Sequence, residues 1–188
     1  MCDGCNKESM DCSMSEWEIK DLGDERVLLV EGVEHRTKYS QNIIERIIKR
    51  KGIHRTPDYL THRVVRTRDL SKLFVKLNET SKGLKILEVG CSAGHITEYL
   101  NEQQCIEEIH AFDVDKAFVD VTELKVTELN LDKVQDVRHL SVKESQSLPY
   151  EDNCFDVIIV LAVVEHLPYE NRHLYVDQYY KKCNYSAS

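Results

Sequence analysis

The sequence lacks any apolar run long enough to cross a membrane as a helix. Its longest uninterrupted apolar stretch is Val157 to Val164, whereas a membrane-spanning helix needs about 20 consecutive apolar residues. The first residues, Met1 to Met14, include acidic side chains and no apolar stretch of the kind that a secretory signal requires. We therefore expect a protein without a membrane partner, in the cytoplasm, where thiols stay reduced.

An excess of basic residues is also lacking. The chain has 25 lysines and arginines against 33 acidic residues, which gives a formal net charge of -8. A negative field repels phosphate-rich partners. The composition therefore argues against nucleic acid as a partner.

The cysteines do not complete a metal site or a disulfide framework. The chain has seven cysteines, an odd number scattered along its length. Cys2, Cys5 and Cys12 form a C-x-x-C with a third thiol nearby, but no fourth Cys or His follows before His35. A structural zinc site needs four ligands, so we expect no metal.

The N-terminal third shows two helical patterns. Residues 1–24 form a polar, cysteine-containing lead that is expected to be flexible, and residues 25–83 form an expected helical extension of the following domain. Within the extension, Val27 to Val30 has the composition of a short strand. The apolar residues that define the two helices are Ile43, Ile44, Ile47 and Ile48, ended by Gly52, and then Leu70, Leu73, Phe74 and Leu77. The basic residues of the first helix, Arg46, Lys49, Arg50 and Lys51, are expected on its solvated side.

From Lys85 onward, strand and helix patterns alternate, which predicts a parallel α/β sheet. The strands are expected over residues 86–89, 109–112, 137–142 and 155–164, and the last helix over residues 171–182. The fourth strand is continuously apolar from Val157 onward, which predicts that helices cover both of its faces.

The most informative stretch is ILEVGCSAGHITEYL, Ile86 to Leu100. Gly90 directly follows a strand and Gly94 begins a helix, so the backbone can turn sharply and a ligand can approach the helix closely. A strand-to-helix turn alone would also explain both glycines. The G-x-G-x-x-G fingerprint of dinucleotide oxidoreductases is lacking, because Ser92 and His95 stand where it needs glycines, and no phosphate-loop lysine follows.

The run E-V-G-C-S-A-G resembles motif I, E/D-x-G-x-G-x-G, of class I S-adenosylmethionine-dependent methyltransferases, with Ser92 at the middle glycine. The resemblance implies a Rossmann-like, doubly wound parallel sheet and S-adenosyl-L-methionine as the cofactor. Cys91 is expected to pack in the loop rather than to act as a nucleophile. The residues of the loop that are expected to bind the cofactor are Glu88, Gly90, Cys91, Ser92 and Gly94.

A second feature that resembles the family is an acidic residue after the second predicted strand. In AFDVD, Asp113 lies 19 positions after Gly94, near the spacing at which the family's ribose-binding carboxylate is found. Asp113 is therefore the candidate for the ribose, with Val114 beside it in the cofactor site and Asp115 as the fallback. Either aspartate could instead end the strand or cap the following helix.

A third mark is SVKESQSLPYEDNCFDVIIV, Ser141 to Val160, which resembles the family's G-D-A-x-x-L-P-F-x-D-x-x-F-D stretch. The resemblance places Glu144 where the family accepts a hydrogen bond from the adenine amino group. It places Ser145 where a backbone amide meets the ring, and Lys143 replaces the usual glycine. In VVEHLP, His166 resembles a residue that faces the methyl-donor side of the pocket. It could act as a base on the acceptor or only shape the pocket.

The class I sheet has seven strands in the order 3-2-1-4-5-7-6. The chain supplies strands one to four in the order 3-2-1-4 and ends before strands five to seven, so residues 84–188 are expected to form a partial methyltransferase domain. The expected function is methyl transfer to a small-molecule acceptor. The alternative is a non-catalytic S-adenosylmethionine-binding or partner-subunit fragment, because an open strand-four edge invites a protein partner or self-association.

Overall fold

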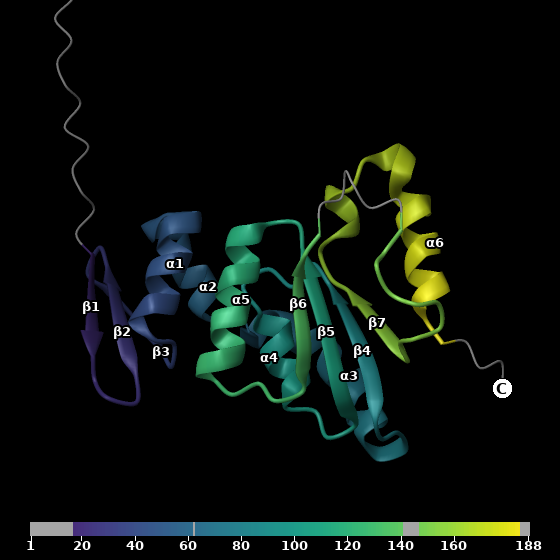
Figure 1. Cartoon of the computed structure of the whole chain (residues 1–188). Coiled ribbons are helices and arrows are strands. Elements are labelled where there is room, and N and C mark those ends of the chain that lie inside the picture. Colours follow the sequence, from purple (N-terminus) through teal and green to yellow (C-terminus); the bar gives the residue numbers. More distant parts are fainter. Residues whose placement is uncertain (1–16, 62, 141–146, 185–188) are drawn as a thin grey trace, which may run out of the picture.

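The computed structural model describes residues 17–61, 63–140 and 147–184, which form two sheets and the helices around them (Figure 1). The central sheet is parallel and contains β4 (Leu84–Val89), β5 (Ile106–Asp113), β6 (Val134–His139) and β7 (Val157–Val160). Its strand order is β6-β5-β4-β7. The predicted parallel α/β sheet and its 3-2-1-4 order are therefore confirmed.

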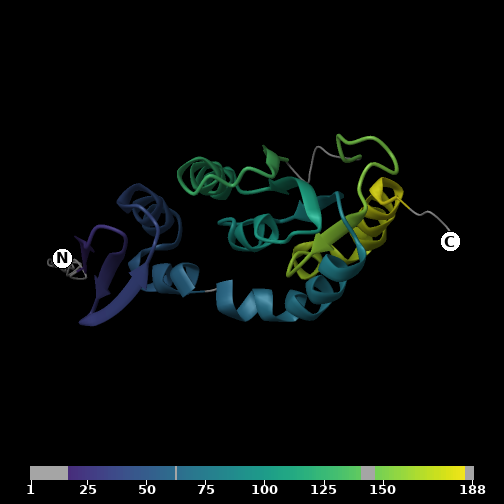
Figure 2. The same ribbon diagram turned by 90° about the horizontal axis from the view of Figure 1, so that it is seen from below.

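Helices cover both faces of this sheet because its central strand is apolar on both sides. Side chains alternate along β4, so Ile86 and Leu87 face opposite ways, and both are fully buried. On the side of Ile86 lie α3 (Arg63–Thr80) and α4 (His95–Asn101). Figure 2 shows α3 running along this side of the sheet.

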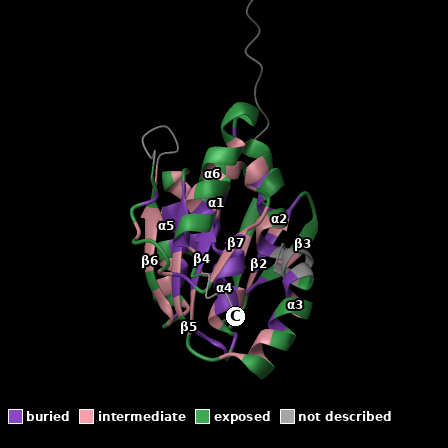
Figure 3. Cartoon of the chain, turned by 90° about the vertical axis from the view of Figure 1, so that its right-hand side faces the viewer, coloured by how far each residue is buried: buried purple, intermediate pink, exposed green. Residues whose placement is uncertain are grey.

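On the side of Leu87 lies the last helix, α6 (Arg172–Lys182), which contributes Tyr179 to the core. Figure 3 shows the buried residues gathered in the central sheet, with the outer surface of α6 exposed.

The N-terminal segment is a small unit of its own that packs on α5 (Lys116–Glu128). Strands β1 (Trp17–Asp21), β2 (Arg26–Val30) and β3 (Val33–Thr37) form an antiparallel meander, which α1 (Gln41–Lys51) and α2 (Thr56–Thr61) follow. The residues that join this unit to α5 are Leu28, Ile43, Ile44, Ile47, Phe118 and Val121.

Helix α1 ends at Gly52, as its sequence predicts. The Ser40 hydroxyl accepts a hydrogen bond from the Ile43 amide at its start, and Gly52, with a φ of 79°, ends it. Ile43, Ile44 and Ile47 are buried. In α3, Leu70 and Phe74 are buried but Leu73 is 46% exposed, so the predicted apolar face is only partly used.

Three expectations require correction. Residues 17–21 of the predicted flexible lead form β1, and the predicted helical extension contains β3 in addition to β2, which confirms the strand expected at Val27 to Val30. The predicted fourth strand is shorter than residues 155–164, because Ala162 has a φ of 54°, which is incompatible with an extended strand.

The expectation that three of seven strands are missing is also wrong as a count. The described residues form seven strands, with four in the parallel sheet and three in the antiparallel sheet that precedes it. β1 and β3 were not predicted, because each has only five residues and most of them are polar. After α6, Cys183 forms an isolated parallel bridge with Phe155, next to the start of β7.

Within the described ranges, no helix combines the length and the apolar character that crossing a membrane requires.

Candidate functional site

A cavity of about 550 Å³ opens where the parallel strands end. Its lining includes Gly90 after β4, Asp113 at the end of β5, Leu140 after β6 and Ala162 after β7. In open α/β sheets, ligands bind outside the carboxyl ends of the strands. The volume lies within the range of about 300–1,000 Å³ that is typical of small-molecule sites.

The loop after β4 is shaped by residues with left-handed backbone conformations. Gly90 and Gly94 both have a φ of 74°. A Cβ at Gly90 would lie 2.4 Å from Val163 Cγ2, and one at Gly94 would lie 3.0 Å from Thr122 Cγ2. Both positions therefore require glycine for reasons of space as well as of conformation. Ser92 has a φ of 49°, so it occupies a conformation that glycine adopts more easily.

Asp113 ties this loop to the end of β5. One of its carboxylate oxygens accepts a hydrogen bond from the Ser92 amide at 2.8 Å, and the other accepts one from the Asp115 amide at 2.8 Å. Asp113 is buried but lines the cavity. A carboxylate oxygen can accept more than one hydrogen bond, so Asp113 retains acceptor capacity toward a bound hydroxyl.

Asp115 has a different set of partners. Its side chain accepts from the Ala117 amide at the start of α5 and forms an ion pair with Arg50. Burial alone would raise the pKa of Asp115, but Arg50 and the helix amides lower it below its usual value. Asp115 thus caps α5, which is the structural role that the sequence left open.

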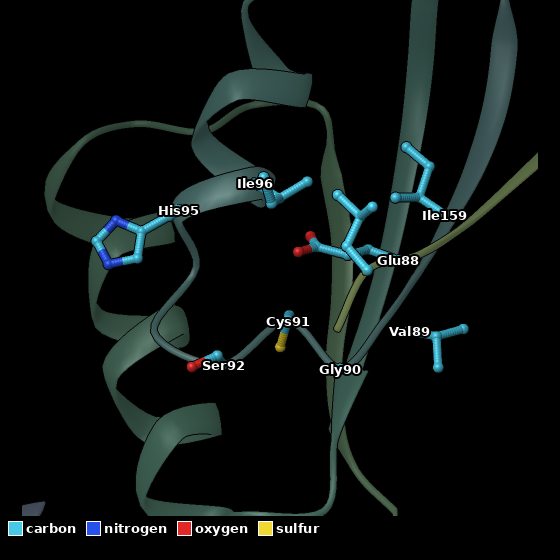
Figure 4. Close-up of a pocket in the computed structure, with 9 residues that line it drawn as sticks. Glu88, Val89, Gly90, Cys91, Ser92, His95, Ile96 and Ile159 are labelled. Carbon is cyan, nitrogen blue, oxygen red and sulfur yellow. The ribbon is translucent and has the colours of Figure 1, made fainter. Parts of the chain in front are cut away.

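Glu88 lies beneath the loop rather than in the large cavity. Figure 4 shows it beside a small cavity of about 10 Å³, which has room for about one water molecule and shares lining residues with the large cavity. Thr97 donates a hydrogen bond to Glu88 at 2.7 Å. Burial raises the pKa of Glu88 to about 8, so the carboxyl group is largely protonated at neutral pH.

Cys91 lines the same small cavity and is buried. Burial raises the pKa of its thiol well above the usual value. A thiol that stays protonated is a poor nucleophile. This location agrees with a packing role.

The other candidates line different parts of the large cavity. Val114 is half exposed and lies beside Asp113. His166 is exposed and lies in a short 3-10 helix, Val164–His166, which follows β7. Tyr179 of α6 adds an aromatic surface, and burial raises the pKa of its hydroxyl to about 12. The structure therefore brings Gly90, Ser92, Asp113, Val114 and His166 to one cavity.

One wall of the cavity was not predicted. It comes from the N-terminal segment and α5, and consists of Lys51, Tyr59 and Phe118. The Tyr59 and Phe118 rings stack with centroids 5.6 Å apart. The Lys51 ammonium lies 4.6 Å from the Phe118 centroid and 5.4 Å from that of Tyr59. The expectation that Lys51 lies on a solvated helix side is therefore wrong, because helical periodicity does not reveal what packs beside the end of a helix.

A buried cluster around Glu98 joins this N-terminal segment to the central domain, because Tyr39 and Lys38 of the segment both contact Glu98. Lys125 of α5 and Glu98 of α4 are both buried, and their charged atoms lie 2.9 Å apart. The Tyr39 hydroxyl donates to Glu98 at 2.7 Å, and the Lys38 ammonium lies 3.1 Å from the other Glu98 oxygen. This cluster was not predicted, because its members come from three separate segments of the chain.

Glu144 and Ser145, and also Cys2, Cys5 and Cys12, lie outside the described residues. Within the part of the chain that the structure describes, no group of three or more His, Cys, Asp or Glu side chains could hold a metal ion.

The sequence matches one family model, described as a methyltransferase domain, over residues 87–182. The match begins in β4 and ends in α6, so it includes the loop after β4, Asp113 and His166. No curated protein matches the chain.

Several solved structures are similar in fold. The [4+2]-cyclase SpnF is 21% identical with a TM-score of 0.51, and the match covers 61% of this chain and 40% of SpnF. The PH0226 protein from Pyrococcus horikoshii is 15% identical with a TM-score of 0.50, over 63% of this chain and 53% of that protein. A SAM-dependent methyltransferase from Aquifex aeolicus is 22% identical with a TM-score of 0.47, over 60% and 57%.

At these identities, the likeness shows the fold alone. The chain spans about half the length of the solved structures that it matches.

Proposed function

The chain belongs to the methyltransferase-domain family, whose model matches half of it, and from that premise we propose that it binds S-adenosylmethionine and transfers the methyl group to a small-molecule acceptor. The observation that supports the proposal most strongly is the position of Asp113. Its carboxylate lines the large cavity at the end of β5, directly beside the glycine-containing loop after β4.

The cavity suits the donor in both size and chemistry. Asp113 would accept hydrogen bonds from the two ribose hydroxyls, and Val114, Leu140 and Leu148 offer apolar surface for the adenine. Glu144 and Ser145 are proposed for the polar edge of the adenine. The positive φ at Gly90 supports a tight turn of the loop beside the donor site.

The donor, when bound, supplies an electrophilic methyl group on a sulfonium. The chain's own residues would then align the acceptor and exclude water around it. His166 lies at the cavity and is proposed to accept the proton that an oxygen or nitrogen acceptor loses, or to shape the acceptor pocket. Glu88, Cys91 and Gly94 are proposed to support the loop from beneath rather than to touch the acceptor.

The fold by itself does not decide the reaction, because one structural neighbour is a cyclase. Methyl transfer is therefore best tested directly. Protein incubated with methyl-labelled S-adenosylmethionine and a cell extract should label a product of low mass. A folded sample that binds the donor but labels nothing would contradict the proposal.

The ribose assignment has a matched pair of variants. Asp113→Ala should weaken S-adenosylmethionine binding by about 10- to 100-fold, since it removes charge-assisted hydrogen bonds. Asp115→Ala should lower stability, because it removes the cap of α5, but leave donor affinity within about threefold. Calorimetric titration of both variants checks this. Equal donor affinity in wild type and Asp113→Ala would overturn the assignment.

A second candidate function is that of a donor-binding partner subunit. β7 is the last strand of the described sheet, and Phe155 near its start pairs with Cys183 through only an isolated bridge. A chain that pairs along β7 would cover this edge. Light scattering tests the candidate: a dimer or larger assembly supports it, and a well-behaved monomer across a wide concentration range contradicts it.

A cytoplasmic location and the absence of a nucleic-acid partner remain predictions. The four cysteines within the described residues, Cys91, Cys105, Cys154 and Cys183, are free thiols, which supports a reducing compartment.

A further inference from the structure

Lys51 is the one lysine or arginine among the described residues that line the large cavity. It is half-buried at the end of α1, against the stacked rings of Tyr59 and Phe118. Its ammonium lies 4.6 Å and 5.4 Å from the centroids of Phe118 and Tyr59. The cation thus rests on aromatic faces at the edge of a space that a small molecule can fill.

The carboxylates around the cavity are already engaged with other groups. Asp115 pairs with Arg50, the residue before Lys51. Asp113 accepts hydrogen bonds from the amides of Ser92 and Asp115. Among the described residues, no carboxylate lies within ion-pair distance of the Lys51 ammonium. Among the described residues, the Lys51 ammonium therefore lies beside the cavity without a neutralising carboxylate. The partial burial of Lys51 would strengthen its attraction to an anion there.

The end of helix α1 does not by itself explain the position of Lys51. Cations in the last turn of a helix are favourable, but Lys49 and Arg50 lie in the same turn. Lys49 is exposed and serves the helix end without entering the cavity. The placement of Lys51 beside the rings is thus an additional feature.

Building on the proposed function, we propose that Lys51, held by Tyr59 and Phe118, binds a carboxylate in the cavity. A lysine ammonium carries three hydrogen-bond donors and a compact charge, which suits a carboxylate oxygen. The carboxylate belongs either to the methionine part of the donor or to the acceptor. In the second case, an aromatic acid is a suitable probe, because the partly buried Tyr59 side chain also lines the cavity.

The first experiment tests the donor's carboxylate. Wild type, Lys51→Gln and Lys49→Gln are titrated with S-adenosylmethionine and with decarboxylated S-adenosylmethionine, which lacks only that group. If the donor's carboxylate is bound, Lys51→Gln weakens S-adenosylmethionine binding about tenfold or more and leaves the decarboxylated ligand unchanged. Lys49→Gln should behave as wild type with both ligands.

The second experiment tests the acceptor's carboxylate. The same three proteins are titrated with benzoate and with the uncharged benzamide, with and without saturating S-adenosylhomocysteine. If the acceptor's carboxylate is bound, wild type and Lys49→Gln prefer benzoate by about tenfold, and Lys51→Gln loses the preference.

A selective loss in either experiment supports the carboxylate site and identifies its source. If Lys51→Gln matches Lys49→Gln with all four probes, the proposal is overturned. Circular dichroism should show the same fold in all three proteins. Failure of the proposed function has a different signature: folded wild type then binds no S-adenosylmethionine at all, while the benzoate titration without S-adenosylhomocysteine still tests Lys51.

Discussion

The two sides of the large cavity are held in different ways. On the donor side, backbone groups fix the geometry: the Ser92 amide donates to Asp113, the Ser92 carbonyl accepts from Thr122, and Gly90 and Gly94 have positive φ. On the other side, the wall is made by side chains, Lys51, Tyr59 and Phe118, which come from three elements. Backbone constraints leave marks in the sequence, whereas packing between distant segments does not.

The largest expected effect comes from the anchor between the two sides. Lys125→Met leaves Glu98 buried without its closest cation, so it should destabilise the protein by about 3–5 kcal/mol. Denaturant unfolding measures this. The matched control is Glu98→Leu combined with Lys125→Met, which removes both charges and should recover much of the loss. A single variant as stable as the double one would show that leaving Glu98 buried without Lys125 carries no penalty.

The same anchor predicts a pH dependence. Burial alone would raise the pKa of Glu98, but Lys125, Tyr39 and Lys38 lower it below its ordinary value. A carboxyl group with a lowered pKa contributes stability above its ordinary pKa and loses it as the pH falls through the folded value. Wild type should therefore lose more stability on acidification than the double variant.

The next largest effect tests the backbone constraints on the donor side of the cavity. In Gly90→Ala, the new Cβ would meet Val163 at a φ of 74°, so we expect a loss of about 2–4 kcal/mol from steric overlap and left-handed strain. Gly32→Ala is the control, since its φ is 81° but no atom lies within 4 Å of the added Cβ. Adding Val163→Ala to Gly90→Ala should recover the part of the stability loss that comes from steric overlap. Equal losses for Gly90→Ala and Gly32→Ala would contradict the close contact.

The smallest expected effect concerns Ser92, which stands where motif I of the family has its middle glycine. Its φ of 49° lies in the left-handed region, so Ser92→Gly should relieve strain and stabilise the protein by up to about 1 kcal/mol. Glycine also raises the conformational entropy of the unfolded chain, and this offsets part of the stabilisation. Thermal unfolding of the two proteins gives the answer, and a clear destabilisation would mean that the serine side chain contributes more than its backbone costs.

Much of the central domain could be predicted from the sequence because its signals are local. The apolar strands, the glycines of the loop and the acidic residue after β5 follow from short-range chain geometry. These local signals predicted the parallel strand order and pointed to Gly90, Asp113 and His166, which line the cavity. Ser92 was also expected at a glycine position, and its positive φ agrees with that expectation.

The remaining features depend on tertiary contacts. Lys51 follows the pattern of a solvated helical residue, yet α2 and α5 pack beside it. Glu88 is buried beneath the loop, where Thr97 donates a hydrogen bond to it, and its expected role in binding the cofactor stays a prediction. Glu98 and Lys125 would each be expected at a helix surface, because charged residues are rarely fully buried unless paired. At none of these positions does the local sequence reveal the tertiary contacts.

The most direct test of the account is a calorimetric titration of the wild-type protein with S-adenosylhomocysteine, the product of the donor, alongside a titration with NADH. The account predicts one-to-one binding of S-adenosylhomocysteine and no binding of NADH. A folded protein that fails to bind S-adenosylhomocysteine, or that binds NADH instead, would contradict the assignment of the cavity to a methyl donor.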